Sequence, residues 1–202
     1  MSYDISPSNL FQTLAGISPF LLGFFLILSS LFNQDIKGII YLGGVLLATA
    51  LNIPIMTMLK SRKSEYASPT CDFIGLPLVG EYDSPSPSSL FIGFTLLYLG
   101  LPMRANNQIN FGVLIFIFGL LIIDIITKTM KKCTTITGAI LGTLIGSLFG
   151  GIYYTLIKSS GYTNLLYFNS LPSNNVVCNK PAKSTFKCSV YKNGELISEN
   201  IA

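Results

Sequence analysis

Residues 136–157 read ITGAILGTLIGSLFGGIYYTLI, an apolar run that holds no charged residue. Such a run predicts a membrane-spanning helix, because hydrocarbon about 30 Å thick takes roughly 20 apolar residues in a helix. Glycine stands at every fourth position in it. With 3.6 residues per turn these positions share one face, where another backbone can come close enough to gain dispersion and weak hydrogen bonds. We therefore predict a glycine zipper that packs this helix through Gly138, Gly142, Gly146 and Gly150.

The run itself does not specify the partner of this face. Packing against another helix of the same bundle is the simplest interpretation, and pairing between copies of the chain is the alternative. A glycine-lined pore is disfavoured, because no polar or charged ring accompanies the glycines.

The composition of the whole chain indicates the same environment. Of 202 residues, 50% are hydrophobic and only 11% are charged, whereas soluble domains carry about a quarter charged residues. The net charge of +4 comes without a long basic run, so nucleic acid is not an expected partner. Histidine is absent, which excludes histidine-based acid–base chemistry and histidine-ligated metal sites. We expect no cofactor and no metal ion.

Four further apolar stretches precede residues 136–157. Together they predict an all-α transmembrane helical bundle of about five spans over residues 1–158, followed by a small extramembrane module over residues 159–202. The third and fourth stretches are short, so two long spans with a re-entrant pair are the alternative. The predicted spans lie near residues 14–32, 39–59, 89–103, 111–126 and 136–157.

The basic residues predict which way the bundle runs, because short cytoplasmic loops carry an excess of Lys and Arg. Two loops, residues 60–88 and 127–135, hold most of these residues. We therefore expect the N-terminus on the cytoplasmic side and, with five spans, the C-terminal module on the other. The residues compared are Lys60, Arg62, Lys63, Lys128, Lys131 and Lys132 against Lys37, Arg104 and Lys158.

The four cysteines divide between the two faces. Cys71 and Cys133 fall in the two loops of one face and are a candidate disulfide pair. Cys178 and Cys188 fall together in the tail, within NNVVCNKPAKSTFKCSVYKNGELI, where β-branched runs flank the turn-like segments NKPAK and YKNGEL. This pattern predicts a small β-rich module closed by a Cys178–Cys188 disulfide. Two reduced thiols are the alternative.

Asp124 is the only acidic residue inside an apolar span. Ionisable groups in spans generally face the bundle interior or an aqueous path. Lys128 follows one turn later, so an i,i+4 ion pair at the membrane interface is the favoured interpretation. A proton relay is the alternative.

The order of motifs from Lys60 to Gly151 resembles the core of the type-2 phosphatidic acid phosphatases, membrane enzymes with a helical-bundle fold. Lys63 and Pro69 stand where that family has a Lys and an Arg-Pro pair, although Ala67 and Ser68 replace the Arg. PSPSS (residues 85–89) stands where the family has PSGH, without the His. Its third motif, an Arg and a nucleophilic His before a glycine-rich helix, is matched only in position, by DIITKTMKKCTT (residues 124–135). Without histidine the family's mechanism cannot operate. The resemblance therefore implies a phosphatase-like scaffold without activity.

An active enzyme would need another nucleophile. Serines at the start of a helix are far more often N-caps than nucleophiles, and we interpret the serines of PSPSS as caps. The residues that an enzyme would have to use are Ser86, Ser88, Ser89 or Cys133, beside Lys63, Lys131 or Lys132.

The whole chain is similar to multi-pass membrane proteins encoded by large icosahedral DNA viruses. The resemblance rests on SPSSLFIGFTLLYLGLPM (residues 86–103), NQINFG (107–112) and SNNVVCNKPAKSTFKCSVYKNGELI (173–197), and on plentiful Asn, Ser, Ile and Lys with no Trp. It implies a non-enzymatic structural role as a minor capsid protein of the virion's internal membrane. The implied partners are lipid, capsid or other virion membrane proteins, and further copies of the chain. A channel or holin ranks third, because polar residues are sparse in the spans.

Overall fold

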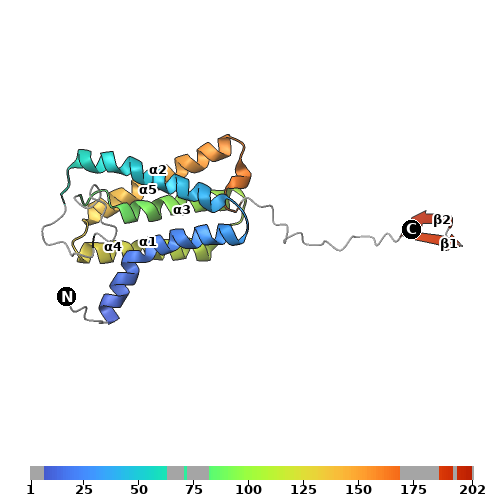
Figure 1. Cartoon of the computed structure of the whole chain (residues 1–202), viewed down its shortest axis with the longest axis horizontal. Helices are drawn as coiled ribbons and strands as arrows, with labels where there is room; N and C mark the ends of the chain where they lie inside the picture. Colours follow the sequence, from blue (N-terminus) through green and yellow to red (C-terminus); the bar gives the residue numbers. More distant parts are fainter. Residues whose placement is uncertain (1–6, 63–70, 72–81, 169–186, 193–194, 202) are drawn as a thin grey trace. The chain divides into compact units, whose positions relative to one another are not determined.

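The computed structural model describes residues 7–62, 71, 82–168, 187–192 and 195–201, and within these ranges it describes side chains from residue 16 to residue 168. Five long helices dominate the first of two units (Figure 1). They are α1 (Pro7–Phe32), α2 (Lys37–Leu59), α3 (Pro87–Ala105), α4 (Phe111–Met130) and α5 (Ile136–Ser159), and a short 3₁₀ helix, η2 (Thr163–Leu165), follows α5.

Four of these helices, α2 to α5, are long and apolar enough to cross a membrane, whereas the described apolar part of α1, Gly16–Phe32, is shorter. The prediction of a transmembrane helical bundle is therefore confirmed with four candidate spans, and a fifth span through α1 stays a prediction. The third and fourth apolar stretches, which are short in the sequence, form α3 and α4, helices of 19 and 20 residues. A helix of 19 residues rises about 28 Å, close to the thickness of the hydrocarbon.

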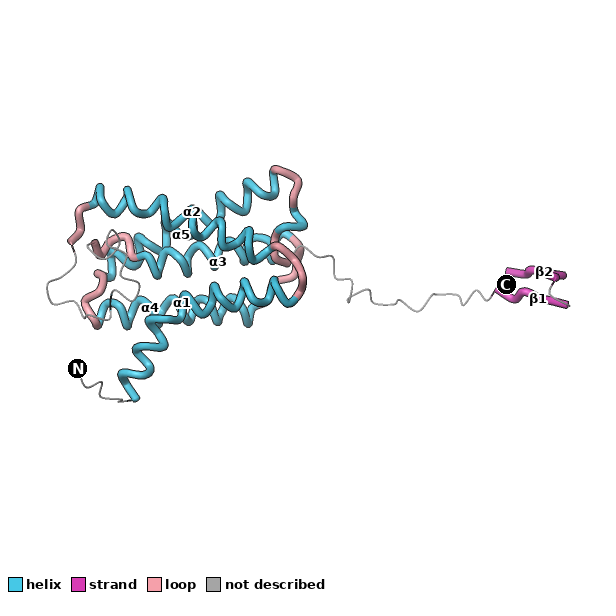
Figure 2. Tube along the Cα trace, in the orientation of Figure 1, coloured by secondary structure: helices cyan, strands magenta, loops and turns pink. Residues whose placement is uncertain are grey.

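The helices lie side by side with short turns after α1, α3 and α4 (Figure 2). The ends of the longer connection between α2 and α3 are held together, because the Asp83 N–H donates to the Ser61 carbonyl oxygen at 3.0 Å. The C-terminal end of α2, the start of α3, the end of α4 and the start of α5 therefore share one end of the bundle. We call this the loop end, and the opposite end the far end.

Local sequence explains several helix boundaries and bends. The Asn110 and Thr135 side chains cap α4 and α5, accepting hydrogen bonds from the backbone N–H groups of Val113 and Gly138 at 3.2 and 3.1 Å. Such caps satisfy donors that have no partner inside the helix. Helix α1 changes direction along its length (Figure 1) and contains Pro19, which removes a backbone donor and bends a helix.

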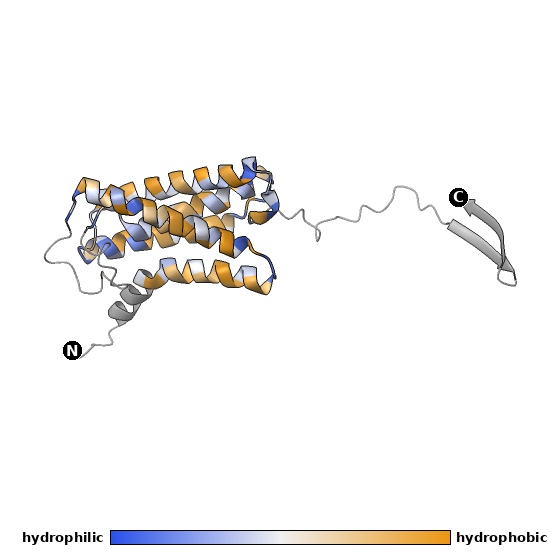
Figure 3. Ribbon diagram, turned by 45° about the horizontal axis from the view of Figure 1, so that its top comes forward, coloured by the Kyte–Doolittle hydropathy of each residue, from blue (hydrophilic) through white to orange (hydrophobic). Residues whose placement is uncertain are grey.

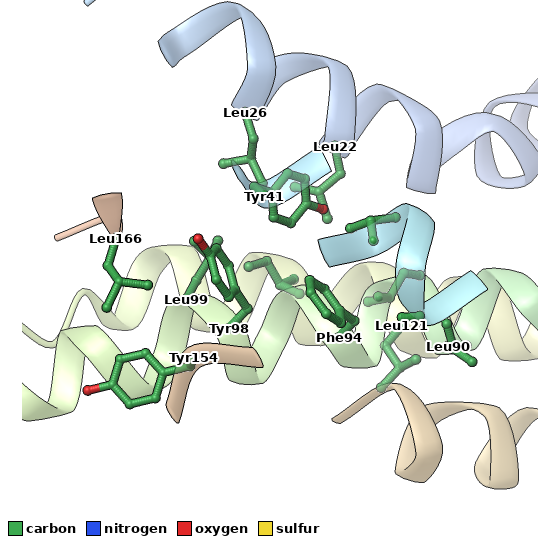
Figure 4. Close-up of a cluster of buried hydrophobic side chains, with 14 of the residues drawn as sticks. Leu22, Leu26, Tyr41, Leu90, Phe94, Tyr98, Leu99, Leu121, Tyr154 and Leu166 are labelled. Carbon is green, nitrogen blue, oxygen red and sulfur yellow. The ribbon is translucent and has the colours of Figure 1, made fainter. Parts of the chain in front are cut away.

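Helix α3 is the most deeply buried of the four candidate spans. Its Phe94 and Tyr98 rings stack with centroids 5.7 Å apart, and Tyr41 of α2 lies 5.7 Å from Tyr98 (Figure 4). The Tyr41 hydroxyl bonds the Thr95 hydroxyl at 2.7 Å and is the donor, since Thr95 already donates to the Phe91 carbonyl oxygen. A closely packed aromatic core thus fills the middle of the bundle.

The most extensive helix–helix contact joins α3 and α5. Three glycines of α5 face backbone carbonyl oxygens of α3 at matching four-residue intervals. A Cβ atom on Gly142 would lie 2.5 Å from the Ser86 oxygen, and Cβ atoms on the next two would lie closer still to their α3 carbonyl oxygens. In return, a Cβ on Gly93 of α3 would lie 2.5 Å from the Thr143 oxygen of α5. The pairs on the α5 ladder are Gly142 with Ser86, Gly146 with Leu90 and Gly150 with Phe94, and Gly138 lies beside Ser84 and Thr134.

The outer surface of the helices is apolar (Figure 3). Phe116 of α4 is 59% exposed and Leu144 of α5 is 62% exposed. Water does not tolerate an apolar surface of this extent on a single chain, whereas hydrocarbon does. The described bundle is that of an integral membrane protein.

The chain after α5 packs on the bundle as far as Phe168. Leu166 is buried, the Tyr167 hydroxyl donates to the Leu26 carbonyl oxygen at 2.9 Å, and the Asn106 amide donates to the Phe168 carbonyl oxygen at 2.8 Å. Burial raises the pKa of Tyr167 to about 12, and the nearby Asp35 acts in the same direction.

Residues 170–202 form a separate unit. Within it β1 (Lys187–Lys192) pairs antiparallel with β2 (Glu195–Ile201), in a register that places Cys188 opposite Asn200 and shifts between Val190 and Tyr191. Cys178 lies outside the described residues. The disulfide-closed β module therefore stays a prediction.

Candidate functional site

A buried polar cluster joins α3 to α4 at the loop end. Ser88 and Ser89 stand in the first turn of α3, and their hydroxyls donate to Oδ2 of Asp124 at 2.9 and 3.0 Å. Asp124 belongs to α4 and is 0% exposed. The unpaired N–H groups of a first turn give a helix N-terminus a partial positive charge, which favours a carboxylate beside it. The cluster therefore fastens the start of α3 to α4.

Ser86 connects this cluster to α5. Its hydroxyl lies 3.3 Å from the hydroxyls of Ser88 and Ser89, and its N–H donates to the Gly138 carbonyl oxygen at 3.0 Å. Ser86 stands at the N-cap position of α3 but its side chain makes no capping hydrogen bond. The predicted cap position of Ser86 is thus confirmed, but capping by a serine side chain is wrong, because the hydroxyls of Ser88 and Ser89 bind Asp124 and that of Ser86 lies beside them.

The ion pair predicted between Asp124 and Lys128 is also wrong. No Lys128 nitrogen lies within ion-pair distance of this carboxylate, although Lys37 and Asp35 at the far end do pair, at 3.6 Å. Burial against α3 draws the carboxylate to the serine hydroxyls, while a lysine at a helix end keeps its ammonium group where water can reach it. The second carboxylate oxygen, Asp124 Oδ1, has no hydrogen-bond partner among the described residues.

The segment before α3 is held by polar groups that the sequence analysis did not single out. The Asn52 amide of α2 donates to the Pro85 carbonyl oxygen at 3.3 Å, and the Thr134 hydroxyl donates to the Asp83 carbonyl oxygen at 2.6 Å. Asn52 is buried within an apolar stretch. An amide in such a place was the available signal, because a polar side chain in a span needs a partner.

Cys71 and Cys133 form a disulfide with their Cα atoms 5.4 Å apart. The bridge joins the α2–α3 connection to the turn after α4, and the loop of chain that it closes contains α3 and α4. Disulfides persist in oxidising compartments, whereas the basic residues of the same loops predict the cytoplasmic side. The two rules therefore disagree about the compartment that the loop end faces.

The remaining predicted residues are not brought into the cluster by any described contact. Lys63 lies outside the described residues. Lys131 and Lys132 follow the end of α4, and burial together with the nearby Lys128 lowers the pKa of Lys131. Within the part of the chain that the structure describes, no three His, Cys, Asp or Glu side chains gather where they could hold a metal ion.

No family model, curated protein or solved structure matches this chain.

An open apolar groove of about 400 Å³ runs between α3 and α5 on the outer surface. The small residues Ser147, Gly151 and Thr155 line it, together with leucines of both helices. The hydroxyls of Ser147 and Thr155 donate to carbonyl oxygens of Gly93 and Gly151, at 3.3 and 2.8 Å. Both hydroxyl donors thus have acceptors within the bundle, so lipid hydrocarbon can fill the groove without leaving these donors unpaired.

The chemistry open to the polar cluster follows from its burial. A nucleophile must reach its substrate, yet Ser89 is 0% exposed and Ser86 is 2% exposed. Their hydroxyls are also bound within the cluster. The arrangement can hold helices together, and its carboxylate can take up a proton.

Proposed function

We propose that this chain is a structural, non-enzymatic membrane protein whose helical bundle anchors it in a bilayer, so that its polar segments contact proteins beside the membrane. One observation carries the proposal. Asp124, Ser88 and Ser89 bind one another between two helices inside the bundle, while the outer surface of the described helices is apolar. Such an interior stabilises a membrane anchor.

Three of the four candidate nucleophiles are engaged in structure. Cys133 is bonded to Cys71, and Ser86 and Ser89 are buried in the cluster. The chain has no histidine for the chemistry of the phosphatase family that it resembles. These observations support a structural role for the bundle, without the phosphatase reaction of that family.

The membrane that we propose is the internal membrane of a large icosahedral DNA virus, beneath the capsid. The proposal rests on the sequence resemblance to multi-pass proteins of such viruses. The partners would be capsid proteins or other virion membrane proteins. Residues 170–202 are a candidate contact segment, because they form a unit apart from the bundle.

The test is to locate the chain in purified virus particles after extraction with a mild detergent. We expect a fraction to stay with the capsid after the lipid has been removed. A variant truncated after Asn169 should still enter the membrane and lose that fraction. Complete release of the full-length chain with the lipid would contradict a contact with the capsid.

The non-enzymatic part of the proposal has its own test. Purified full-length protein in lipid nanodiscs should release no phosphate from phosphatidic acid above the rate of empty nanodiscs. Release that disappears in Ser89→Ala but persists in Thr137→Ala, a matched change at an exposed position, would establish an enzyme instead.

A further inference from the structure

The carboxyl group of Asp124 is fully enclosed, yet only half of it is hydrogen-bonded. Ser88 and Ser89 both donate to Oδ2, at 2.9 and 3.0 Å. Oδ1 is buried and has no partner among the described residues. A buried carboxylate needs hydrogen bonds or a counter-ion for its whole charge, because an uncompensated charge in a low-dielectric interior is very costly.

No counter-ion in the described bundle meets this need. On α4 itself Lys128 acts on Asp124 through space by its charge, but no ion pair joins the two side chains. The charged residues of α2, α3 and α5 are Lys37, Arg104 and Lys158, and all three stand at the far end. The described apolar part of α1 carries no charge. Lys60, Arg62, Asp83, Lys131 and Lys132 lie in connections at the loop end, outside the helices.

A proton is the ligand that fits this geometry. A metal ion would need several oxygen ligands around it, whereas the free Oδ1 offers one atom in an enclosed place. We infer that Asp124 is a proton-binding site: Oδ1 takes a proton from water, and Oδ2 keeps both serine hydroxyls as donors. The step forms one O–H bond on the carboxyl group, converts the carboxylate to a neutral acid and transfers no electrons.

The enclosed site lies nearer to the face of the membrane at the loop end than to the other face. Towards the loop end the cluster continues through Ser88, which is half-buried, and Ser86. Towards the far end the aromatic core closes the bundle, since Tyr41, Phe94 and Tyr98 are each at most 1% exposed (Figure 4). Asp124 therefore exchanges its proton with the compartment at the loop end, and it is a site of proton storage or sensing and not part of a path across the membrane.

Infrared spectroscopy of the full-length protein in nanodiscs tests the inference directly. A protonated carboxyl group has a carbonyl stretching band that a carboxylate lacks. At neutral pH we expect this band in the parent protein and in Asp83→Asn, a change in another buried acidic residue of the loop end, and we expect it to be absent from Asp124→Asn. Absence of the band from the parent protein at neutral pH, or its presence unchanged in Asp124→Asn, would overturn the inference.

Chemical labelling provides two further measurements that do not depend on whether Asp124→Asn folds. Dicyclohexylcarbodiimide, an apolar reagent that enters the bilayer and reacts with protonated carboxyl groups, should label Asp124 in the parent protein, and labelling should fall as pH rises. In Ser88→Ala the carboxylate loses one donor, so the pH at which labelling is half lost should rise. Peptide mapping that finds Asp124 unlabelled, or a midpoint that Ser88→Ala leaves unchanged or lowers, would contradict proton binding at this site.

Discussion

The carbonyl oxygen of Leu90 in α3 occupies the place where Gly146 in α5 would carry a Cβ atom. The same relationship repeats one turn before and one turn after it, so α3 and α5 are in register over three successive contacts. Approach of this kind gains dispersion over the whole length of two helices, which is the main source of helix association in lipid. The glycine face of α5 is thus covered within the chain. Pairing of two copies through it would require α3 to leave.

The first prediction concerns this contact. Gly146→Ala should lower the free energy of unfolding of the bundle by about 2–3 kcal/mol, in the upper part of the range for overpacking. The loss is large because the added methyl group meets backbone atoms, which cannot rotate away as a side chain can. The measurement is thermal or denaturant unfolding in detergent, compared with the parent chain.

Gly119→Ala is the matched control for that change. Gly119 lies within α4, and nothing comes within 4 Å of the position of its Cβ. Alanine is the better helix former, so this variant should be neutral or more stable by up to about 1 kcal/mol. Equal losses in the two variants would show that α3 and α5 do not pack through Gly146.

The second prediction compares two buried tyrosines. Tyr41→Phe should cost about 1 kcal/mol, because it removes the hydrogen bond to Thr95 and leaves that hydroxyl with one partner fewer. Tyr98→Phe should be neutral or stabilising, since the Tyr98 hydroxyl is buried without a partner among the described residues. Unfolding of both variants under one set of conditions checks the pair. A larger loss from Tyr98→Phe than from Tyr41→Phe would mean that an ordered water or another group satisfies the Tyr98 hydroxyl.

The sequence predicted the helical bundle because the signals are local and strong. Length and apolarity located α2 to α5 within a few residues, and the glycine period showed that one face of α5 admits close approach. The ladder could not identify α3 as its partner. The glycines show which helix face lacks side chains, but they contact backbone carbonyl oxygens, which every residue has. The residue opposite Gly146 is Leu90, and nothing in its type indicates that contact.

The polar cluster was misjudged for a related reason. Each pair considered from the sequence, the serines with their own helix and Asp124 with Lys128, is close along the chain. The bonds in the structure, between Ser89 and Asp124, join residues 35 positions apart. For a polar side chain in water, a partner nearby in the sequence is the natural prediction, because water solvates the side chain whenever that partner is absent. Inside a bundle, the cost of burying a polar atom favours whichever partner the packing brings near.

The third prediction tests the local pairing that the structure does contain. Thr135→Ala should destabilise α5 by about 1 kcal/mol, because it removes the acceptor for the Gly138 N–H at the start of the helix. Thr137→Ala, two residues later, removes only a hydroxyl that contacts Thr135 at 3.1 Å and is exposed. Its effect on unfolding should be within about 0.5 kcal/mol. The cap has no role if both changes have the same effect.

The fourth prediction concerns the disulfide. A double variant, Cys71→Ser with Cys133→Ser, should lower the stability of the bundle by up to about 4 kcal/mol, the loop-entropy value for a bridge of this span. The loss should be smaller than that limit, because helices that stay inserted already restrict the unfolded chain. The double variant Cys178→Ser with Cys188→Ser is the control, and it should leave unfolding of the bundle unchanged since those residues belong to the other unit.

The same bridge decides between two opposing rules for orientation. Non-reducing mass mapping of the chain taken from its native membrane should show Cys71 joined to Cys133. Labelling of single-cysteine variants at Ser61 and at Asn107, on the loop end and the far end, with a reagent that does not cross the membrane then shows which end faces outwards. If the bridge is present and the loop end is cytoplasmic, the basic residues set the orientation and a dedicated thiol oxidant must act in that compartment. If both thiols are free, the prediction of a stabilising bridge is wrong, and the basic residues alone determine the expected side.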